Sequence, residues 1–291
     1  MAKHVALTIV IFGALLLGGC NQPEIDTTDS SYDQNPNAVT EGQLINTLEK
    51  PLVIPYDTAI KTIHIMVALC DNRYQGIVPV PAGIGNGQDP RTNLYWGCGY
   101  GIKTFFKRSA VWQLVKSQQI DTLILERAVF KHRTKNYYVV ADAYNGKHIE
   151  TCTRNFLKST SGQKKDTANY NGLHLGIAGN AKLIAYIGHN GLMDFAIEDS
   201  FKNVDGIKRD VLMLACSSRY YFRQKFDTAY VKPIVWTKAL MAPEAYTIHD
   251  AIAAYISAKP DSVILDAAIS AYAKYQKCGK KGAASILVSG Y

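Results

Sequence analysis

Two short apolar runs, residues 183–187 and 211–215, constrain the fold of this chain more than any other feature. Each run is five residues long, rich in aliphatic side chains and bounded by glycine or small polar residues, which is typical of strands buried on both faces. Gly188 and His189 follow the first run, and Cys216 follows the second. Adjacent parallel strands end at the same edge of a sheet, and ligand sites of open α/β sheets lie at that edge. We therefore expect His189 and Cys216 to meet there, although 27 positions separate them in sequence.

The chain after residue 55 alternates between strand-like and helix-like patterns. Further strands are expected at residues 62–69, 122–130, 137–143, 233–237 and 284–288, and helices at residues 102–117, 147–158, 219–229, 245–257 and 263–277. Residues 73–101 and 159–180 are rich in Gly, Pro or polar residues and are expected as loops, the first of them flexible and close to a substrate. This alternation predicts an α/β fold, a three-layer sandwich whose central sheet is mainly parallel.

The amino-terminal segment has the pattern of a targeting sequence. A short basic start precedes an apolar run over residues 5–17, which is too short to span a membrane comfortably. The run ends in Leu17-Gly18-Gly19-Cys20, which resembles the lipobox of bacterial lipoproteins. The resemblance implies that residues 1–19 are a cleaved lipoprotein signal peptide and that Cys20 carries lipid. An ordinary secretory signal with an incidental cysteine is the alternative.

Residues 20–54 are polar, rich in Asp, Thr, Ser and Asn, and have little apolar periodicity. We expect them to form a flexible tether between the lipid and a folded domain at residues 55–291. The expected partner of Cys20 is therefore a lipid membrane, and the expected location is the bacterial cell envelope, with the leaflet left open.

Charge and cysteine content narrow the possible partners. The formal net charge is +8, or +7 without Lys3, and the basic residues are scattered, which favours a solvated surface or contact with anionic lipid or envelope polymer over nucleic acid. Five cysteines follow Cys20, and an odd number cannot all pair with each other. The sequence contains no CxxC motif and no regular spacing of ligands, so we expect no metal site, no cofactor and no disulfide scaffold.

The order of motifs resembles a known peptidase fold. A strand ending in Gly188-His189, a strand ending in Ala215-Cys216 and a strand leading to the helix start Ala242-Pro243 resemble the caspase-like fold of caspases, gingipains, legumains and bacterial CHAT-type domains. The resemblance covers about residues 61–257 and is carried by short motifs. It implies that His189 is the general base or acid, that Cys216 is the nucleophile, and that the two work as a dyad.

The residues themselves support the same chemistry, because a thiol beside an imidazole is an activated nucleophile. The family usually has glycine directly after the histidine, where its amide helps to hold the oxyanion, whereas this chain has Asn190. Asn190 still carries a backbone N–H, so Asn190 and Gly191 are expected at the substrate and oxyanion position. The acids Asp71, Asp142, Asp194 and Glu198 fall near expected strand ends, and an acidic pocket there would favour Arg or Lys substrates.

Three functions remain open from the sequence. The first is a membrane-anchored cysteine peptidase-like hydrolase that acts on peptide bonds. The second is a catalytically inactive caspase-like module that binds a peptide or protein, with residues 73–101 as its recognition element. The third is a structural envelope lipoprotein.

Overall fold

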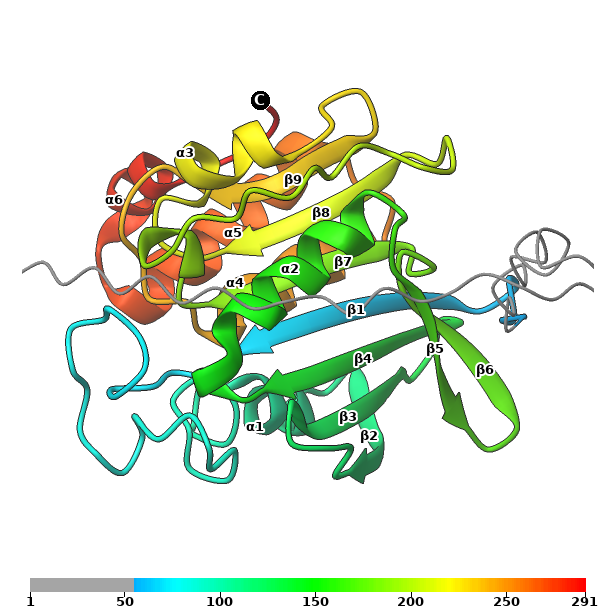
Figure 1. Cartoon of the computed structure of the whole chain (residues 1–291), viewed down its shortest axis with the longest axis horizontal. Helices are drawn as coiled ribbons and strands as arrows, with labels where there is room; N and C mark the ends of the chain where they lie inside the picture. Colours follow the sequence, from blue (N-terminus) through cyan, green and yellow to red (C-terminus); the bar gives the residue numbers. More distant parts are fainter. Residues whose placement is uncertain (1–54) are drawn as a thin grey trace, which may run out of the picture. The chain divides into compact units, whose positions relative to one another are not determined.

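The computed structural model describes residues 55–291, which form an α/β fold around an eight-stranded sheet (Figure 1). The expected signal peptide, Cys20 and the tether lie outside the described residues. The strands of the sheet are β1 (Lys61–Ala68), β2 (Trp112–Gln118), β3 (Ile124–His132), β4 (Tyr137–Tyr144), β7 (Leu183–Gly188), β8 (Arg209–Leu214), β9 (Val231–Thr237) and β10 (Leu287–Val288). A separate hairpin consists of β5 (Lys165–Tyr170) and β6 (Leu173–Ala178).

The sheet has the order β10-β9-β8-β7-β1-β4-β3-β2. Its central strands β4, β1, β7, β8 and β9 are parallel, while β10, β3 and β2 are joined to it by antiparallel pairing. All six residues of β7 are buried, as are Val211 to Leu214 in β8. Strands covered on both faces need nearly continuous apolar sequence, and this confirms the expectation from the two short runs.

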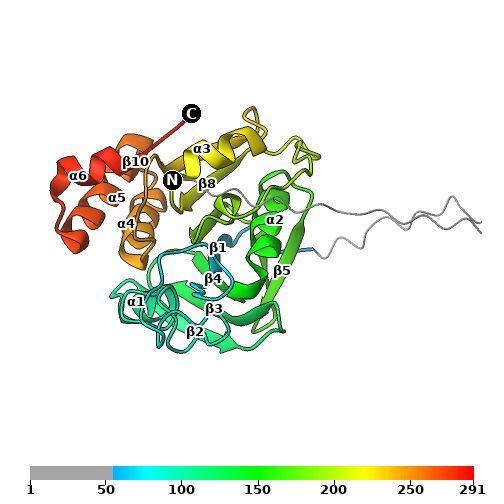
Figure 2. The same cartoon turned by 60° about the vertical axis from the view of Figure 1, so that its left-hand side comes forward.

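Helices cover both faces of the sheet (Figures 1 and 2). One face packs on α2 (Ile149–Thr160) and α3 (Ser218–Phe222) through a cluster that includes Phe156, Tyr186 and Phe222. The other face packs on α1 (Ile102–Arg108), α4 (Ala245–Tyr255), α5 (Asp261–Gln276) and α6 (Gly279–Ile286). The α/β class and the mainly parallel sheet are therefore confirmed, with the layers of a three-layer sandwich.

The expected helix over residues 102–117 is wrong in its second half. Helix α1 ends at Arg108, and Ser109 leaves it with φ −65° and ψ 138°. The chain then forms β2, which pairs antiparallel with β3 from the pair Trp112 and His132 onward. Buried Trp112 packs against Phe106 of α1 at a ring-centroid distance of 6.1 Å. Pairing with the sheet and burial of the indole outweigh the helical spacing of the apolar residues.

Two further expectations are corrected at the local level. Residues 159–180 contain the β5–β6 hairpin, whose turn is Asn171-Gly172 with φ values of 47° and 78°. An Asn-Gly pair tolerates positive φ at both turn positions, so it is the sequence signal for this hairpin. The expected strand over residues 284–288 is helical as far as Ile286, and only Leu287–Val288 pair with β9.

The buried part of the sheet contains one charged cluster. Asp142 of β4 accepts hydrogen bonds from Arg127 of β3, at 2.6 and 2.8 Å, and from His64 of β1, at 3.0 Å. The other ring nitrogen of His64 accepts from the backbone N–H of Ala178 at 3.1 Å, so the cluster also holds the β5–β6 hairpin. Asp142, which the sequence places near a strand end, is thus a core residue and belongs to no acidic substrate pocket.

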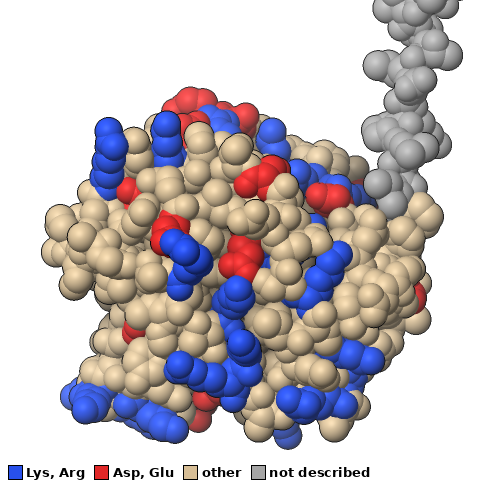
Figure 3. All heavy atoms as spheres, turned by 90° about the horizontal axis from the view of Figure 1, so that it is seen from below, with Lys and Arg blue, Asp and Glu red and all other residues tan. Residues whose placement is uncertain are grey.

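Basic and acidic side chains are interspersed on the face of the molecule that Figure 3 draws. Figure 3 shows one face of the molecule, on which Lys and Arg side chains are spread with Asp and Glu between them. None of the helices in residues 55–291 has the length and apolar character needed to cross a lipid bilayer.

Candidate active site at the carboxyl edge of the sheet

His189 and Cys216 lie just beyond the ends of neighbouring parallel strands. The pairing of β7 with β8 extends to Ile187 opposite Leu214, and each functional residue comes two positions later. The side-chain amide of Asn190 donates to the backbone carbonyl of Cys216 at 2.7 Å, which ties the two strand ends together. The structure therefore brings the two predicted residues to the same edge of the sheet, which we call the carboxyl edge.

The Cys216 thiol is partly exposed and lies against the segment that follows β9. Its Sγ accepts a hydrogen bond from the Met241 backbone N–H at 3.4 Å and lies 3.6 Å from the Met241 carbonyl. The next residue, Ser217, has φ 49° and ψ 33°, a left-handed conformation that is uncommon outside glycine. The chain thus turns sharply after Cys216 and enters α3 at Ser218.

A buried hydroxyl pair fixes this turn. Thr237, at the end of β9, accepts from the Ser218 backbone N–H at 3.0 Å and donates to the Ala215 carbonyl. In return the Ser218 hydroxyl accepts from the Thr237 backbone N–H at 3.0 Å. Both residues are fully buried. These hydrogen bonds therefore replace the ones that the polar atoms of the turn make with water in the unfolded chain.

Thr237→Val is expected to destabilise the protein by about 2–3 kcal/mol, because it leaves the Ser218 amide and the Ala215 carbonyl buried without a partner. Thr237→Ser keeps the hydroxyl and serves as the control, with a loss of about 1 kcal/mol. Urea unfolding measures both values. Equal losses in the two variants would show that the hydroxyl contributes no more than the methyl group, which would contradict this account.

The geometry of His189 depends on Gly188. Gly188 has φ 136°, and a Cβ at this position would collide with the carbonyl oxygen of Ala68 in β1. The His189 side chain is 6% exposed, and its Nε2 lies 2.8 Å from Oδ2 of Asp194. The same oxygen accepts from the backbone N–H of Gly76 at 3.0 Å. Asp194 thus fixes the ring through Nε2, which leaves Nδ1 as the nitrogen able to act on another group.

Asn190 and Gly191, the predicted substrate and oxyanion residues, are buried at the same edge. The Asn190 side chain is committed to structure, since its oxygen caps the turn at the Leu192 backbone N–H. Burial has the largest effect on the pKa of Tyr186 and raises it well above its usual value. The Gly191 backbone N–H donates to the Tyr186 hydroxyl oxygen, and this hydrogen bond lowers that pKa by a smaller amount. Within residues 55–291 no hydrogen bond is found from the backbone N–H of either Asn190 or Cys216. These two amides are the donors that remain for an oxyanion.

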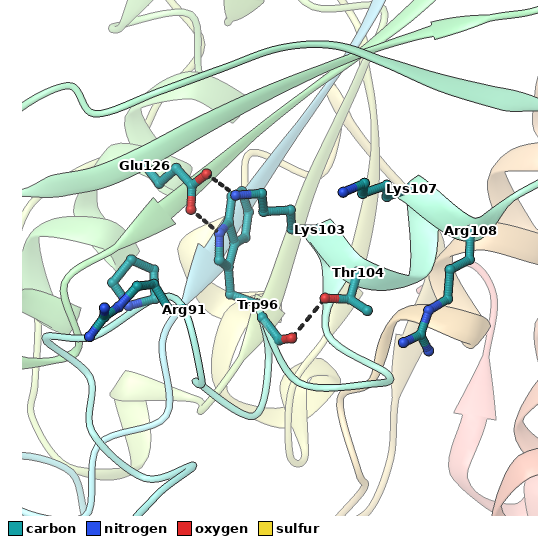
Figure 4. Close-up of a pocket in the computed structure, with 9 residues that line it drawn as sticks. Arg91, Trp96, Lys103, Thr104, Lys107, Arg108 and Glu126 are labelled. Atoms are coloured by element: carbon teal, nitrogen blue, oxygen red, sulfur yellow. Dashed lines mark hydrogen bonds and ion pairs between the residues drawn. The ribbon is translucent and has the colours of Figure 1, made fainter.

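Residues 73–101 are held firmly to the carboxyl edge. The Asn93 side chain accepts from the Cys70 backbone N–H at 3.2 Å and donates to the Cys70 carbonyl at 2.8 Å. Trp96 is fully buried, and its Nε1 donates to Glu126 of β3 at 2.7 Å (Figure 4). Trp96 therefore anchors the segment to the core, and these contacts do not match the flexible loop that the sequence predicts.

A basic cavity of about 430 Å³ lies beside this anchor. Figure 4 shows the residues that line it. Of its four cations, Lys103 contacts Glu126 and Arg91 pairs with Asp89. The other two, Lys107 and Arg108, are in the last turn of α1, where positive charge stabilises the free carbonyls of a helix. The cations of this cavity are thus accounted for by the fold.

A second thiol, Cys70, lies at the end of β1. It is fully buried, and burial together with the nearby Asp71 raises its pKa to about 11. The pKa of the Tyr95 hydroxyl is raised, mainly by burial and to a smaller extent by the charges of Cys70 and Cys216. Tyr95 forms a hydrogen bond with Cys70 and therefore lies near both thiols. All five cysteines in the described part of the chain are free. Cys216 differs from Cys70 because it is partly exposed.

Asp194 makes a contact that the sequence pattern does not predict. The pattern groups it with Asp71 and Glu198 as acids near strand ends, and in the structure Asp194 pairs with His189. Asp71 is 1% exposed and accepts hydrogen bonds within its own loop. The signal that identifies Asp194 is the Asn190-Gly191 turn, which returns the chain toward His189 within five residues.

A metal site or a known relative would help to identify the function of this edge. Within residues 55–291 no group of three or more His, Cys, Asp and Glu side chains is arranged to hold a metal ion. Comparison of the chain with protein-family models, with curated proteins and with solved structures gives no match.

Proposed function

We propose that this chain is a membrane-anchored cysteine peptidase-like hydrolase that acts on peptide bonds with His189 and Cys216. The observation that carries the proposal is the placement of a partly exposed thiol and an imidazole at the ends of two adjacent parallel strands, joined by the Asn190 to Cys216 hydrogen bond of 2.7 Å. The resemblance of these strand ends to the caspase-like fold supports the same assignment. Cys20 would carry the anchor, and the domain would then lie in the bacterial envelope.

The reaction would use each group in one step. His189 takes the thiol proton at Nδ1, and the Cys216 sulfur attacks the scissile carbonyl carbon. The resulting oxyanion is held by the Cys216 and Asn190 backbone amides, and loss of one such donor typically lowers a rate by about 100–1,000-fold. The carbon–nitrogen bond then breaks as His189 returns the proton to the leaving amine. Water attacks the thioester, the acid product leaves and the thiol is restored.

Asp194 would support this cycle through the ring. Its carboxylate lies 2.8 Å from Nε2 of His189, so it holds the proton on that nitrogen and stabilises the imidazolium that forms during attack. The Gly76 amide bound to the same oxygen keeps the carboxylate in place. In this proposal Asp194 is a positioning residue, because it acts through His189.

A catalytically inactive caspase-like binding module is the second candidate. The observation that favours it is Asn190, whose buried side chain occupies the position after the histidine, where the resembled family has glycine. The structural envelope lipoprotein remains the third interpretation and shares the prediction that Cys20 is the mature amino terminus.

The test incubates the full chain with a peptide library prepared from a digested proteome and identifies new peptide termini by mass spectrometry. We expect termini that share a residue class at the cleaved position and that are missing with Cys216→Ala. If the wild-type chain and Cys216→Ala give identical termini, the hydrolase is refuted. If the library peptides are retained by both proteins without cleavage, the binding module replaces it.

A further inference from the structure

The edge of the sheet opposite to His189 and Cys216 contains a basic cavity of about 510 Å³. It lies between the start of β1, the turn that leads into β7 and the start of β8, and Tyr56 near the beginning of the described chain also lines it. Five cationic side chains line this cavity with a single carboxylate, that of Asp210; the five are Lys61, Lys165, Lys182, Lys208 and Arg209. No step of the proposed hydrolysis uses these residues.

The fold neutralises some of these charges. Asp205 pairs with Lys165 at 2.8 Å and with Arg209 at 2.6 Å. Asp210 accepts a hydrogen bond from the Tyr255 hydroxyl at 2.7 Å, so its carboxylate is already occupied. Neither Lys182 nor Lys208 has an acidic partner among residues 55–291. Lys61 at the start of β1 has no acidic partner there either, so three lysines at or just before the starts of β1, β7 and β8 line the cavity without a paired carboxylate.

A buried hydroxyl provides an independent sign of a missing ligand. Thr62 lines the cavity, is 2% exposed, and its Oγ1 has no hydrogen-bond partner in the described part of the chain. An unpartnered buried hydroxyl costs about 1–3 kcal/mol, so such groups are rare in folded proteins. A ligand that accepts from Thr62 and carries negative charge toward Lys182 and Lys208 would satisfy all three groups.

We propose that this cavity, defined by Thr62, Lys182 and Lys208, binds a phosphate group. Phosphate presents several acceptor oxygens and more negative charge than a carboxylate, which matches a cavity lined by Lys61, Lys182 and Lys208 without paired carboxylates and by Thr62. The phosphate could belong to a soluble metabolite or to an anionic lipid headgroup, since both present the same chemistry. The proposal is independent of the hydrolase, because the cavity lies at the other edge of the sheet.

The test uses the full chain with Cys20→Ser, which removes any lipid from the protein. Binding of inorganic phosphate is measured by calorimetry, and binding to phosphatidylglycerol vesicles is compared with binding to phosphatidylcholine vesicles by sedimentation at constant salt. We expect Lys182→Gln combined with Lys208→Gln to weaken binding about tenfold or more. The control pair Lys277→Gln with Lys281→Gln removes the same charge from exposed positions outside the cavity and should change binding less than about twofold.

Thr62→Val separates a formed site from a diffuse basic surface. It keeps the shape and the net charge, so we expect weaker phosphate binding, by about threefold or more, with a melting temperature that is unchanged or higher. Dependence on Thr62 and the lysine pair with inorganic phosphate supports a soluble source, and the same dependence with phosphatidylglycerol vesicles alone supports a lipid source. Absence of binding in both arms, equal loss in the control pair, or binding unaffected by Thr62→Val would overturn the proposal.

Discussion

Replacing either Cys216 or His189 by alanine is expected to lower peptide hydrolysis by at least about 1,000-fold, and replacing both is expected to cost no more than replacing one. The reason is that a nucleophile and its base act as a unit, so removing one already ends the step in which the other takes part. The measurement is kcat/KM for a peptide found in the library experiment, for the two single variants and the double variant.

Cys278→Ala is the matched control, because Cys278 is an exposed free thiol that does not follow a strand of the sheet. It should retain full activity. Hydrolysis that survives in Cys216→Ala would contradict the assignment of the nucleophile. Losses that multiply in the double variant would show that His189 and Cys216 act separately and do not form one site.

Asp142→Asn is expected to destabilise the fold by about 3–5 kcal/mol, which is the largest effect on stability that we predict. Asp142 is fully buried between Arg127 and His64, and the neutral amide would leave the guanidinium without its counter-charge in the interior. Urea unfolding measures the loss. Asp266→Asn is the control, since its pair with Lys280 is more than half exposed on both sides and should contribute less than about 1 kcal/mol.

The same cluster predicts a dependence of stability on pH. Burial acts to raise the pKa of Asp142, but the hydrogen bonds from Arg127 and His64 outweigh it and lower that pKa to about 2. A carboxyl group whose pKa is depressed in the folded state contributes stability above its unfolded pKa of about 3.9, and this contribution is lost as the pH falls through the folded pKa. The stability difference between wild type and Asp142→Asn should therefore narrow between about pH 4 and pH 2. A difference that stays constant over this range would contradict the account.

The fold class follows from the sequence where one physical requirement dominates. Strands buried on both faces need continuous apolar runs, and this requirement identifies β7 and β8 from their residues alone. The prediction is wrong where a local pattern competes with strand pairing. Trp112 and Val115 share a helical spacing with Phe105, but their segment gains a neighbouring strand and a buried indole in the sheet.

The sequence predicts the two residues of the site that follow buried strands, but not those that loops bring to it. The strand ends place His189 and Cys216 at one edge, because the register of parallel strands determines where each strand stops. Gly76 and Met241 cannot be assigned to the site from sequence, because each reaches it through a loop whose path depends on tertiary packing. Asp194 differs, since the short Asn190-Gly191 turn returns it to His189. Thr237 cannot be assigned either, since a threonine at a strand end has no signal for the partner of its hydroxyl.

The most direct test of the central claim, that the carboxyl edge joins His189 and Cys216 into one reactive site, is the alkylation rate of each thiol. The full chain with Cys98→Ser and Cys278→Ser is treated with iodoacetamide at neutral pH, and modification is followed by peptide mass spectrometry. We expect Cys216 to react well before the buried Cys70 and Cys152, and His189→Ala to slow Cys216 by about tenfold or more. A Cys216 rate that is unchanged by His189→Ala, or no faster than that of Cys70, would contradict the account.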